Sequence, residues 1–235
     1  MEIIPVIDLM GGTVVHARRG ERHAYRPLSS PLCNGSKPAD VVAGYLSVHP
    51  FTTVYIADLD AIMGKGDSGV IIAELGRQFP GIAFWVDNGL SSPSDCRVWL
   101  ERGLGDLVLG SEAQRDIAAI DTLSPEVAAG RIVLSLDFKN GQFLGPTALL
   151  EQTELWPRRL IAMTLSRVGS DAGPDFDLLD HLRTQAPGKS IFAAGGVRGG
   201  EDLVELHRRG FSGVLVASAL HSGRIGEREI AAICA

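Results

Sequence analysis

The sequence has few cysteines and no grouping of residues that would bind a metal. Its 235 residues include three cysteines, which are odd in number and widely spaced: Cys33, Cys96 and Cys234. This usage predicts neither a disulfide framework nor a zinc knuckle. The six histidines are scattered along the chain. We therefore expect reduced thiols in a cytoplasmic protein, and no metal site.

An excess of positive charge is also missing. Lys and Arg total 22 against 28 for Asp and Glu, which gives a net charge of -6 and a pI near 5.5. Nucleic-acid binding depends on clustered cations, so this balance argues against a nucleic-acid partner. No apolar run approaches the length of a membrane span, and the first residues match a strand rather than a signal peptide. The expected partner is a small molecule, with no membrane involved.

Apolar residues are plentiful and arranged in alternating strand and helix patterns. A hydrophobic share of 45% allows a large core, and we expect one domain over residues 1–235. Strand patterns cover residues 2–8, 53–58, 82–87, 106–110, 131–137, 160–165 and 190–194, with a last one ending before Ser218. Helix patterns lie between them, including residues 39–48, 69–78, 93–102, 113–123, 147–156, 175–185 and 226–234. Eight such units predict an α/β fold, a (β/α)8 TIM barrel, with an open doubly wound sheet as the alternative.

One segment of the chain is repeated. Residues 192–220 align without a gap on residues 85–113, so that Gly196 meets Gly89 and Ser218 meets Ser111. Each copy reads as strand, glycine-containing turn, amphipathic helix, strand. Backbone N–H groups that converge at such strand ends can cradle a phosphate, and two copies predict two cradles. The alternative is that the glycines only make tight turns.

A second repeat involves carboxylates. Residues 6–12 and 135–141 are alike and lie half a chain apart, which places Asp8 and Asp137 opposite each other in a barrel. Active sites of such barrels gather at the carboxyl ends of the strands, and paired carboxylates there can move protons. Asp58 and Asp60 end another strand. For these two, a structural role as acceptors of backbone N–H groups remains equally open.

Residues 13–37 show no sustained periodicity and are rich in cations. A loop this long is usually functional. Its basic and aromatic residues are either a clamp for an anionic substrate, acting as a mobile lid, or a solvated loop: Arg18, Arg19, Arg22, His23, Tyr25 and Arg26.

The motifs IIPVIDLMGG, AAGGVRGGEDL and VLVASAL resemble the HisA/HisF family of histidine biosynthesis over essentially the whole chain. The resemblance implies a half-barrel repeat and an Amadori isomerisation of an aminoaldose phosphate without a cofactor. It also implies that Asp8 and Asp137 are catalytic. The phosphate sites it implies are Gly195 and Gly196 with Ala217 and Ser218, and Asn88 and Gly89 with Gly110 and Ser111.

Some positions depart from the family pattern. Val168 stands where the family has its second catalytic acid, and Thr164 or Asp171 are the candidate substitutes. Asp87 places a carboxylate beside the second phosphate site, so we expect an anion at the first site alone. Phe143 is the one candidate for the family's fifth-loop aromatic. These departures argue against the histidine-pathway isomerase. The long first loop, RRGERHAYRP, resembles that of a HisA-like paralogue group associated with methanogens and methylotrophs. A role in making tetrahydromethanopterin, or a non-catalytic ligand-binding barrel, are the alternatives.

Overall fold

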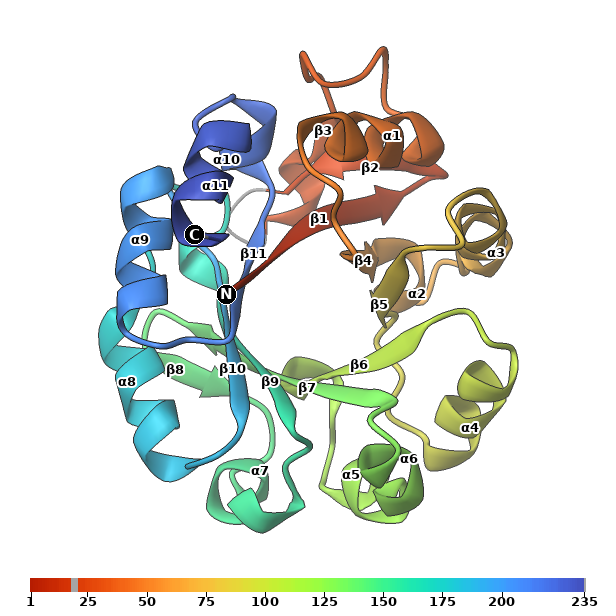
Figure 1. The fold of residues 1–235 in the computed structure, drawn as a ribbon. Coiled ribbons are helices and arrows are strands. Elements are labelled where there is room, and N and C mark those ends of the chain that lie inside the picture. Colours follow the sequence, from red (N-terminus) through yellow and green to blue (C-terminus); the bar gives the residue numbers. More distant parts are fainter. Residues whose placement is uncertain (18–20, 235) are drawn as a thin grey trace.

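The computed structural model describes residues 1–17 and 21–234, and within them a closed parallel barrel. Figure 1 looks along the barrel, with the helices outside it. The barrel strands are β1 (Glu2–Met10), β4 (Thr53–Asp58), β5 (Ala83–Asp87), β6 (Asp106–Gly110), β7 (Ile132–Lys139), β9 (Arg159–Thr164), β10 (Ser190–Ala194) and β11 (Gly213–Val216). Strand β11 pairs with β1, for example Ile3 with Val214, and this pairing closes the sheet. The fold is a (β/α)8 barrel, and the open sheet is excluded.

The helices surround the barrel. They are α1 (Pro38–Val48), α2 (Leu59–Ile62), α3 (Gly69–Gln78), α4 (Pro93–Glu101), α5 (Ala118–Thr122), α6 (Ser124–Ala128), α7 (Ala148–Glu151), α8 (Phe176–Gln185), α9 (Gly200–Arg208), α10 (Ser218–His221) and α11 (Glu227–Cys234). None of these described helices is long and apolar enough to cross a membrane.

Two predicted helices are shorter than expected. The helix expected over residues 113–123 starts at Ala118, and Pro125 lies in the first turn of a separate helix, α6. The helix expected over residues 147–156 stops at Glu151. The indole of Trp156 donates a 2.6 Å hydrogen bond to the Leu149 carbonyl, which a continued helix would need as an acceptor for residue 153.

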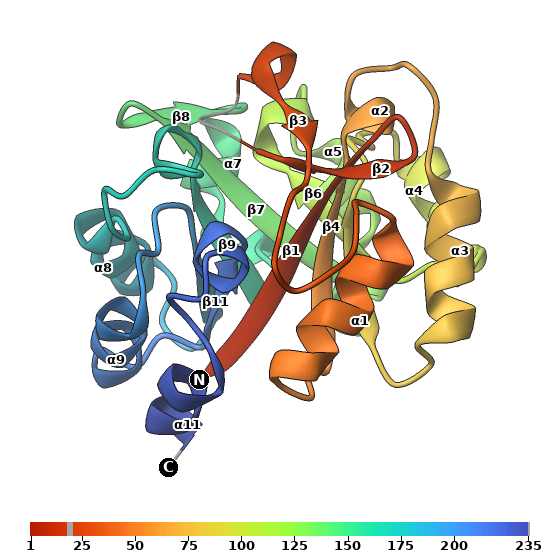
Figure 2. The ribbon, with the colours of Figure 1, turned by 90° about the horizontal axis from the view of Figure 1, so that it is seen from above.

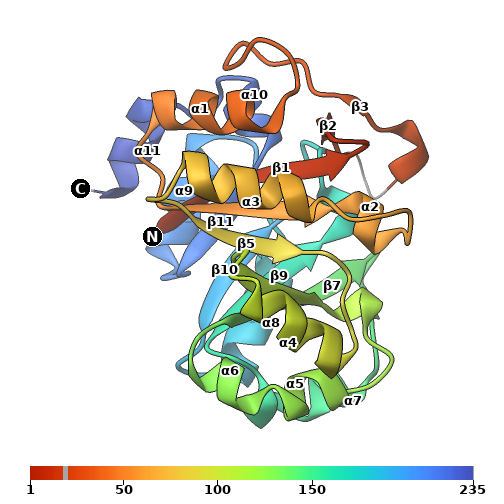
Figure 3. The ribbon, with the colours of Figure 1, turned by 90° about the vertical axis from the view of Figure 1, so that its right-hand side faces the viewer.

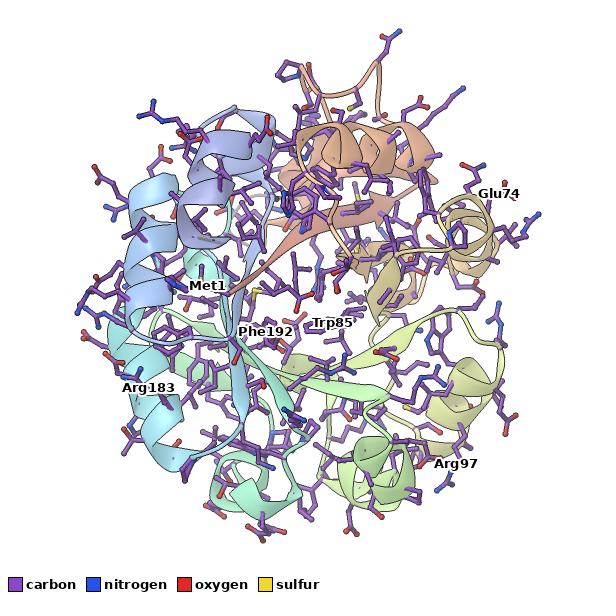
Figure 4. All side chains as sticks on the ribbon, viewed as in Figure 1. Met1, Glu74, Trp85, Arg97, Arg183 and Phe192 are labelled. Atoms are coloured by element: carbon purple, nitrogen blue, oxygen red, sulfur yellow. The ribbon has the colours of Figure 1, made fainter. Side chains whose placement is uncertain are left out.

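Strand alternation separates two apolar layers. In β1, Ile3, Ile7 and Leu9 belong to the layer that packs under the helices, whereas Ile4 points into the barrel. Trp85 and Phe192 meet inside the barrel edge to face, with ring centroids 4.9 Å apart, and Figure 4 shows both there. These two residues are equivalent in the repeat. The repeat is therefore a structural half-barrel symmetry, because it brings equivalent side chains together near the axis.

Three short strands extend the barrel at one end. They are β2 (Thr13–His16), β3 (Arg26–Pro27) and β8 (Gln142–Leu144), and Figures 2 and 3 show the chain termini at the opposite end of the barrel from β2 and β3. Strand β2 pairs with β1 so that Asp8 faces Val15, and β8 pairs with β7 so that Asp137 faces Leu144. The two hairpins have the same register. The sequence pattern indicated no regular structure over residues 13–37, whereas the structure has the short strands β2 and β3 in this segment.

Candidate active site

A cavity of about 350 Å³ lies at the carboxyl ends of the barrel strands. Four carboxyl groups line it: Asp8 from β1, Asp87 from β5, Asp137 from β7 and Glu112 from the turn after β6. The three aspartates face inward near the carboxyl ends of their strands, so the alternation that fills the barrel below with apolar side chains places polar ones at the mouth.

The Asp8 carboxyl group is half-buried and faces the cavity. No described residue gives it a hydrogen bond. Burial removes water that would solvate its charge, and this raises the pKa of Asp8 from 3.8 to about 7. The group can therefore both accept and release a proton near neutrality.

Asp137, in contrast, is held in place by three donors. Its Oδ1 accepts from the Ser135 hydroxyl at 2.6 Å, and its Oδ2 accepts from the Glu112 backbone N–H at 3.1 Å and lies 3.2 Å from the Ser111 hydroxyl. Burial outweighs these bonds and raises the pKa of Asp137 to about 7. This carboxyl group has a fixed orientation and the same proton affinity as Asp8.

Asp87 is bonded by Tyr55 and by its own turn. The Tyr55 hydroxyl donates to Oδ2 at 3.3 Å and the Gly89 N–H donates to Oδ1 at 3.1 Å. Burial raises the pKa of Asp87 to about 6. The pKa of Tyr55 is raised well above its usual value by burial and by the charges of Asp87, Asp137 and Asp8. Tyr55 thus stays protonated and is a hydrogen-bond donor beside all three carboxyl groups.

The first predicted phosphate site opens into the cavity. Gly195, Gly196, Ala217 and Ser218 all line it. Gly195 has φ +99° and Gly196 has φ +87°, and a Cβ on Gly195 would stand 2.5 Å from the Thr164 carbonyl oxygen. Only glycine fits this turn, because a Cβ at either position would collide with a backbone carbonyl group.

The second predicted phosphate site does not open into the cavity. Asn88, Gly89, Gly110 and Ser111 are not among the described residues that line it. The Ser111 hydroxyl lies 2.7 Å from the Leu144 carbonyl oxygen. A Cβ on Gly110 would stand 3.1 Å from Asp87 Oδ2 and 3.4 Å from Asp137 Oδ2, so two carboxylates converge where an anion would approach.

The other predicted residues divide between the cavity and the surface. Thr164 is buried and Asp171 is exposed, where it pairs with Arg224 at 2.6 Å; neither lines the cavity, whereas Val168 does. In strand β9, the side chain of Met163 faces into the barrel, so that of the next residue, Thr164, faces outward. The structure thus puts no acid among the described lining residues on β9.

The predicted substrate loop is only partly at the site. Arg22 lines the cavity and forms a 2.7 Å ion pair with Glu112 across its mouth. Arg26 donates to the Tyr25 carbonyl at 2.9 Å and lies outside the lining. Arg18 and Arg19 fall outside the described residues. Whether this segment acts as a lid stays a prediction.

Asp58 and Asp60 have the structural role that the sequence left open, as acceptors of backbone N–H groups. Asp58 is fully buried and accepts from the backbone N–H of Ser68 at 2.6 Å and the Ser68 hydroxyl at 2.9 Å. Asp60 accepts from the Gly11 N–H at 2.7 Å. Neither faces the cavity.

Sequence reasoning missed several lining residues, among them His16, Tyr55, Glu112, Lys139 and His221. Tyr55 could have been predicted from the sequence, because it lies three residues before Asp58 on the inward face of a strand that the sequence pattern indicated. His16 was not, because its position depends on a hairpin that the sequence pattern did not indicate.

The comparisons with known proteins agree with this arrangement of barrel and cavity. A family model described as "Histidine biosynthesis protein" matches residues 2–226. The chain belongs to this family. It is the HisA/HisF family that the motifs resemble, and the match covers the whole barrel.

Relatives within the histidine biosynthesis protein family differ in what is known of them. An uncharacterized protein of Methanocaldococcus jannaschii is 36% identical, over 98% of this chain and 97% of its own. Two proteins are named 1-(5-phosphoribosyl)-5-((5-phosphoribosylamino)methylideneamino) imidazole-4-carboxamide isomerase. The one from Methanocorpusculum labreanum is 28% identical over 97% of this chain and 98% of its own. The one from Lactiplantibacillus plantarum is 28% identical over 98% of both.

Proposed function

We propose that the protein is an acid/base isomerase of the aldose–ketose type whose small-molecule substrate carries one phosphate or similar anionic group. The observation that supports this most is the pair of carboxyl groups, Asp8 and Asp137, whose pKa values are both raised to about 7 in one cavity. A general acid and a general base work best when their pKa values lie near the working pH.

In the proposed reaction, Asp137 acts as the acid and Asp8 as the base. Protonated Asp137 gives its proton to the ring oxygen of an aminoaldose, the C1–O bond breaks, and the nitrogen lone pair forms a C1=N iminium bond. Asp8 then takes the proton from C2, and the C–H electrons form an enaminol. Asp8 returns the proton to C1 while the enaminol hydroxyl gives its proton to Asp137, so both carboxyl groups are restored and the aminoketose is an isomer of the substrate. The Tyr55 hydroxyl, which donates to Asp87 Oδ2 at 3.3 Å, lines the same cavity.

The anionic group is assigned to the Gly195–Gly196 turn with Ala217 and Ser218. The isomerases among the relatives act, by their printed name, on a compound with two phosphoribosyl groups. Here the second turn is closed by Asp87 and Ser111. We therefore infer a substrate with a single anionic end, and a reaction other than the histidine-pathway isomerisation.

The test is isomerisation in deuterated water. A set of N-substituted aminoaldose 5-phosphates is incubated with the protein, and deuterium uptake from solvent and ketose formation are followed by NMR. Asp8→Asn is the matched inactive control. We expect uptake with at least one monophosphate and no rescue of a histidine auxotroph lacking the isomerase. Rescue of the auxotroph, or equal uptake with Asp8→Asn, would refute the proposal.

The similarity to a methanogen protein favours a second candidate, a step in making a one-carbon carrier such as tetrahydromethanopterin. Deleting the gene in a host that makes this carrier tests it, because carrier levels should then fall while growth without histidine continues. A barrel that only binds its ligand is the third reading, which the Asp8→Asn comparison separates from catalysis.

A further inference from the structure

Both half-barrels place a serine within two residues of the end of an equivalent strand, yet only one of the two lines the cavity. Ser218 follows β11 and lines the cavity, whereas Ser111 follows β6 and is fully buried. The Ser111 hydroxyl lies close to the Leu144 carbonyl and Asp137, and it accepts from the Asp137 backbone N–H at 2.8 Å. The Ser111 hydroxyl is therefore engaged in hydrogen bonds within the protein and does not line the cavity.

The hairpins explain the difference. Val15 faces Asp8 as Leu144 faces Asp137, so the next residues, His16 and Gly145, are also equivalent. His16 Nε2 lies 3.2 Å from the Ser218 hydroxyl, although the two residues are 202 positions apart. At the equivalent point of the other half, Gly145 offers no side chain and stands against the Ser111 backbone. One half of the symmetric mouth therefore has an imidazole where the other half has none.

We propose that His16 is a specificity-determining residue that, with Ser218 and the Gly195–Gly196 turn, binds the anionic group of the substrate and so decides which half of the symmetric cavity receives it. This rests on the proposed function. A protonated imidazole makes a charge-assisted hydrogen bond to a phosphate or carboxylate, and backbone N–H groups supply the rest of the site.

The neighbouring imidazole does not share this role. His221 also lines the cavity, but its Nε2 is 2.8 Å from the Tyr45 hydroxyl and its Nδ1 is 2.9 Å from the Ser30 hydroxyl. Burial lowers the pKa of His221 to about 4, so it is neutral at working pH. Its contacts tie α10, and with it Ser218, to α1 and to the loop around Ser30.

Other charges at the mouth also respond to pH. The other titratable and charged groups among the described residues that face the same cavity are Asp8, Arg22, Tyr25, Tyr55, Asp87, Glu112, Asp137, Lys139 and His221. As pH rises, the carboxyl groups of Asp8, Asp87 and Asp137 ionise and repel an anion, which weakens binding in the same direction as a loss of positive charge from an imidazole at position 16. Only a substitution at His16 separates the two effects.

The experiment measures sulfate binding to the full chain by calorimetry at pH 6 and pH 8. Sulfate keeps its charge over this range, so the pH dependence comes from the protein. His16→Gln keeps a hydrogen-bonding side chain that cannot be protonated. Because His16 is at the exposed rim, we expect His16→Gln to bind about fivefold more weakly than the wild type at pH 6 and equally at pH 8.

Ser111→Ala is the matched control in the other half-barrel. It should leave sulfate affinity unchanged, whereas Ser218→Ala should weaken it at both pH values; thermal melts check that each variant is folded. Equal affinity of His16→Gln and wild type at pH 6, or an equal loss in Ser111→Ala, overturns the role of His16 and leaves the anionic substrate in place. Absence of sulfate binding to the wild type at both pH values overturns both.

Discussion

Asp8→Asn is expected to stabilise the folded protein above neutral pH while it removes the proposed base. The Asp8 carboxyl group has no hydrogen-bond donor among the described residues, and burial raises its pKa to about 7. In the unfolded chain the same group titrates near 3.8. Folding therefore favours the protonated form. Its contribution to stability is fully present below about pH 4 and is lost as pH rises toward the folded pKa of about 7.

The size of the effect follows from the shift. A difference of roughly three pKa units corresponds to about 4 kcal/mol for a fully buried group. Asp8 is only half-buried and its oxygen atoms meet cavity water, so we expect about half of this, roughly 2 kcal/mol at pH 8. Asparagine has the same shape without the charge. For a chain of 235 residues, 2 kcal/mol raises the melting temperature by about 5 °C.

Urea denaturation of wild type and Asp8→Asn at pH 8 and pH 4 measures this difference. The variant should be more stable at pH 8 and nearly equal at pH 4, where the wild-type carboxyl group is protonated. Asp58→Asn is the control. Asp58 is buried but accepts several hydrogen bonds, so this change should destabilise the protein by about 1 to 3 kcal/mol at pH 8. A loss of stability in Asp8→Asn at pH 8 would refute the description of Asp8 as a carboxyl group whose charge is disfavoured by burial and to which no described residue donates a hydrogen bond.

Three further predictions concern residues around the cavity. Asp87→Ala introduces alanine, the residue found at the equivalent position 194 of the repeat, and should raise the number of sulfate ions bound in calorimetry from one to two. A single bound sulfate would mean that Ser111 alone closes the second turn. Relative to His221→Asn, the wild type should lose up to about 3 kcal/mol in urea as pH falls from 6.5 toward 4, because the pKa of His221 is lowered to about 4; parallel pH curves would contradict this. Tyr55→Phe should raise the pKa of Asp87 above about 6 in a carbon-detected NMR titration, because it removes a donor to Oδ2, and an unchanged value would show that the 3.3 Å bond is too weak to matter.

The barrel and its carboxyl pair were predictable because both follow from short-range patterns. Apolar runs ended by a carboxylate and a glycine turn mark strand ends, and a parallel barrel gathers those ends at one mouth. The gap-free repeat predicted that Trp85 and Phe192 are equivalent, and the structure shows them in contact. These predictions did not require knowing which strands pair with each other.

What the sequence could not predict depends on short strands outside the eight-stranded barrel. Strands β2, β3 and β8 have four residues or fewer, too few for a period-two pattern to stand out. Their register decides that His16 reaches Ser218 and that the Leu144 carbonyl engages Ser111. The repeat alone predicted the same role for both serines. Thr164 was a different kind of error, because counting from Ile161 along β9 places it on the outward face.

The symmetry of the two carboxyl groups and the asymmetry of the two strand ends beside them together support the roles proposed for Asp8 and Asp137. Asp8 and Asp137 are equivalent in strand position and in pKa, so neither strand position nor proton affinity distinguishes base from acid. The position of the proposed anion site distinguishes the two carboxyl groups. Strand β1 pairs with β11, which leads into Ala217 and Ser218, whereas β7 pairs with β6, which leads into Ser111. In the proposed function, a substrate anchored by its anionic group at Ser218 lies beside Asp8, to which no described residue donates a hydrogen bond, and extends toward Asp137, which accepts several. A carboxylate without such bonds suits the group that takes a proton from carbon, and a carboxyl group in a fixed orientation suits the group that protonates an oxygen.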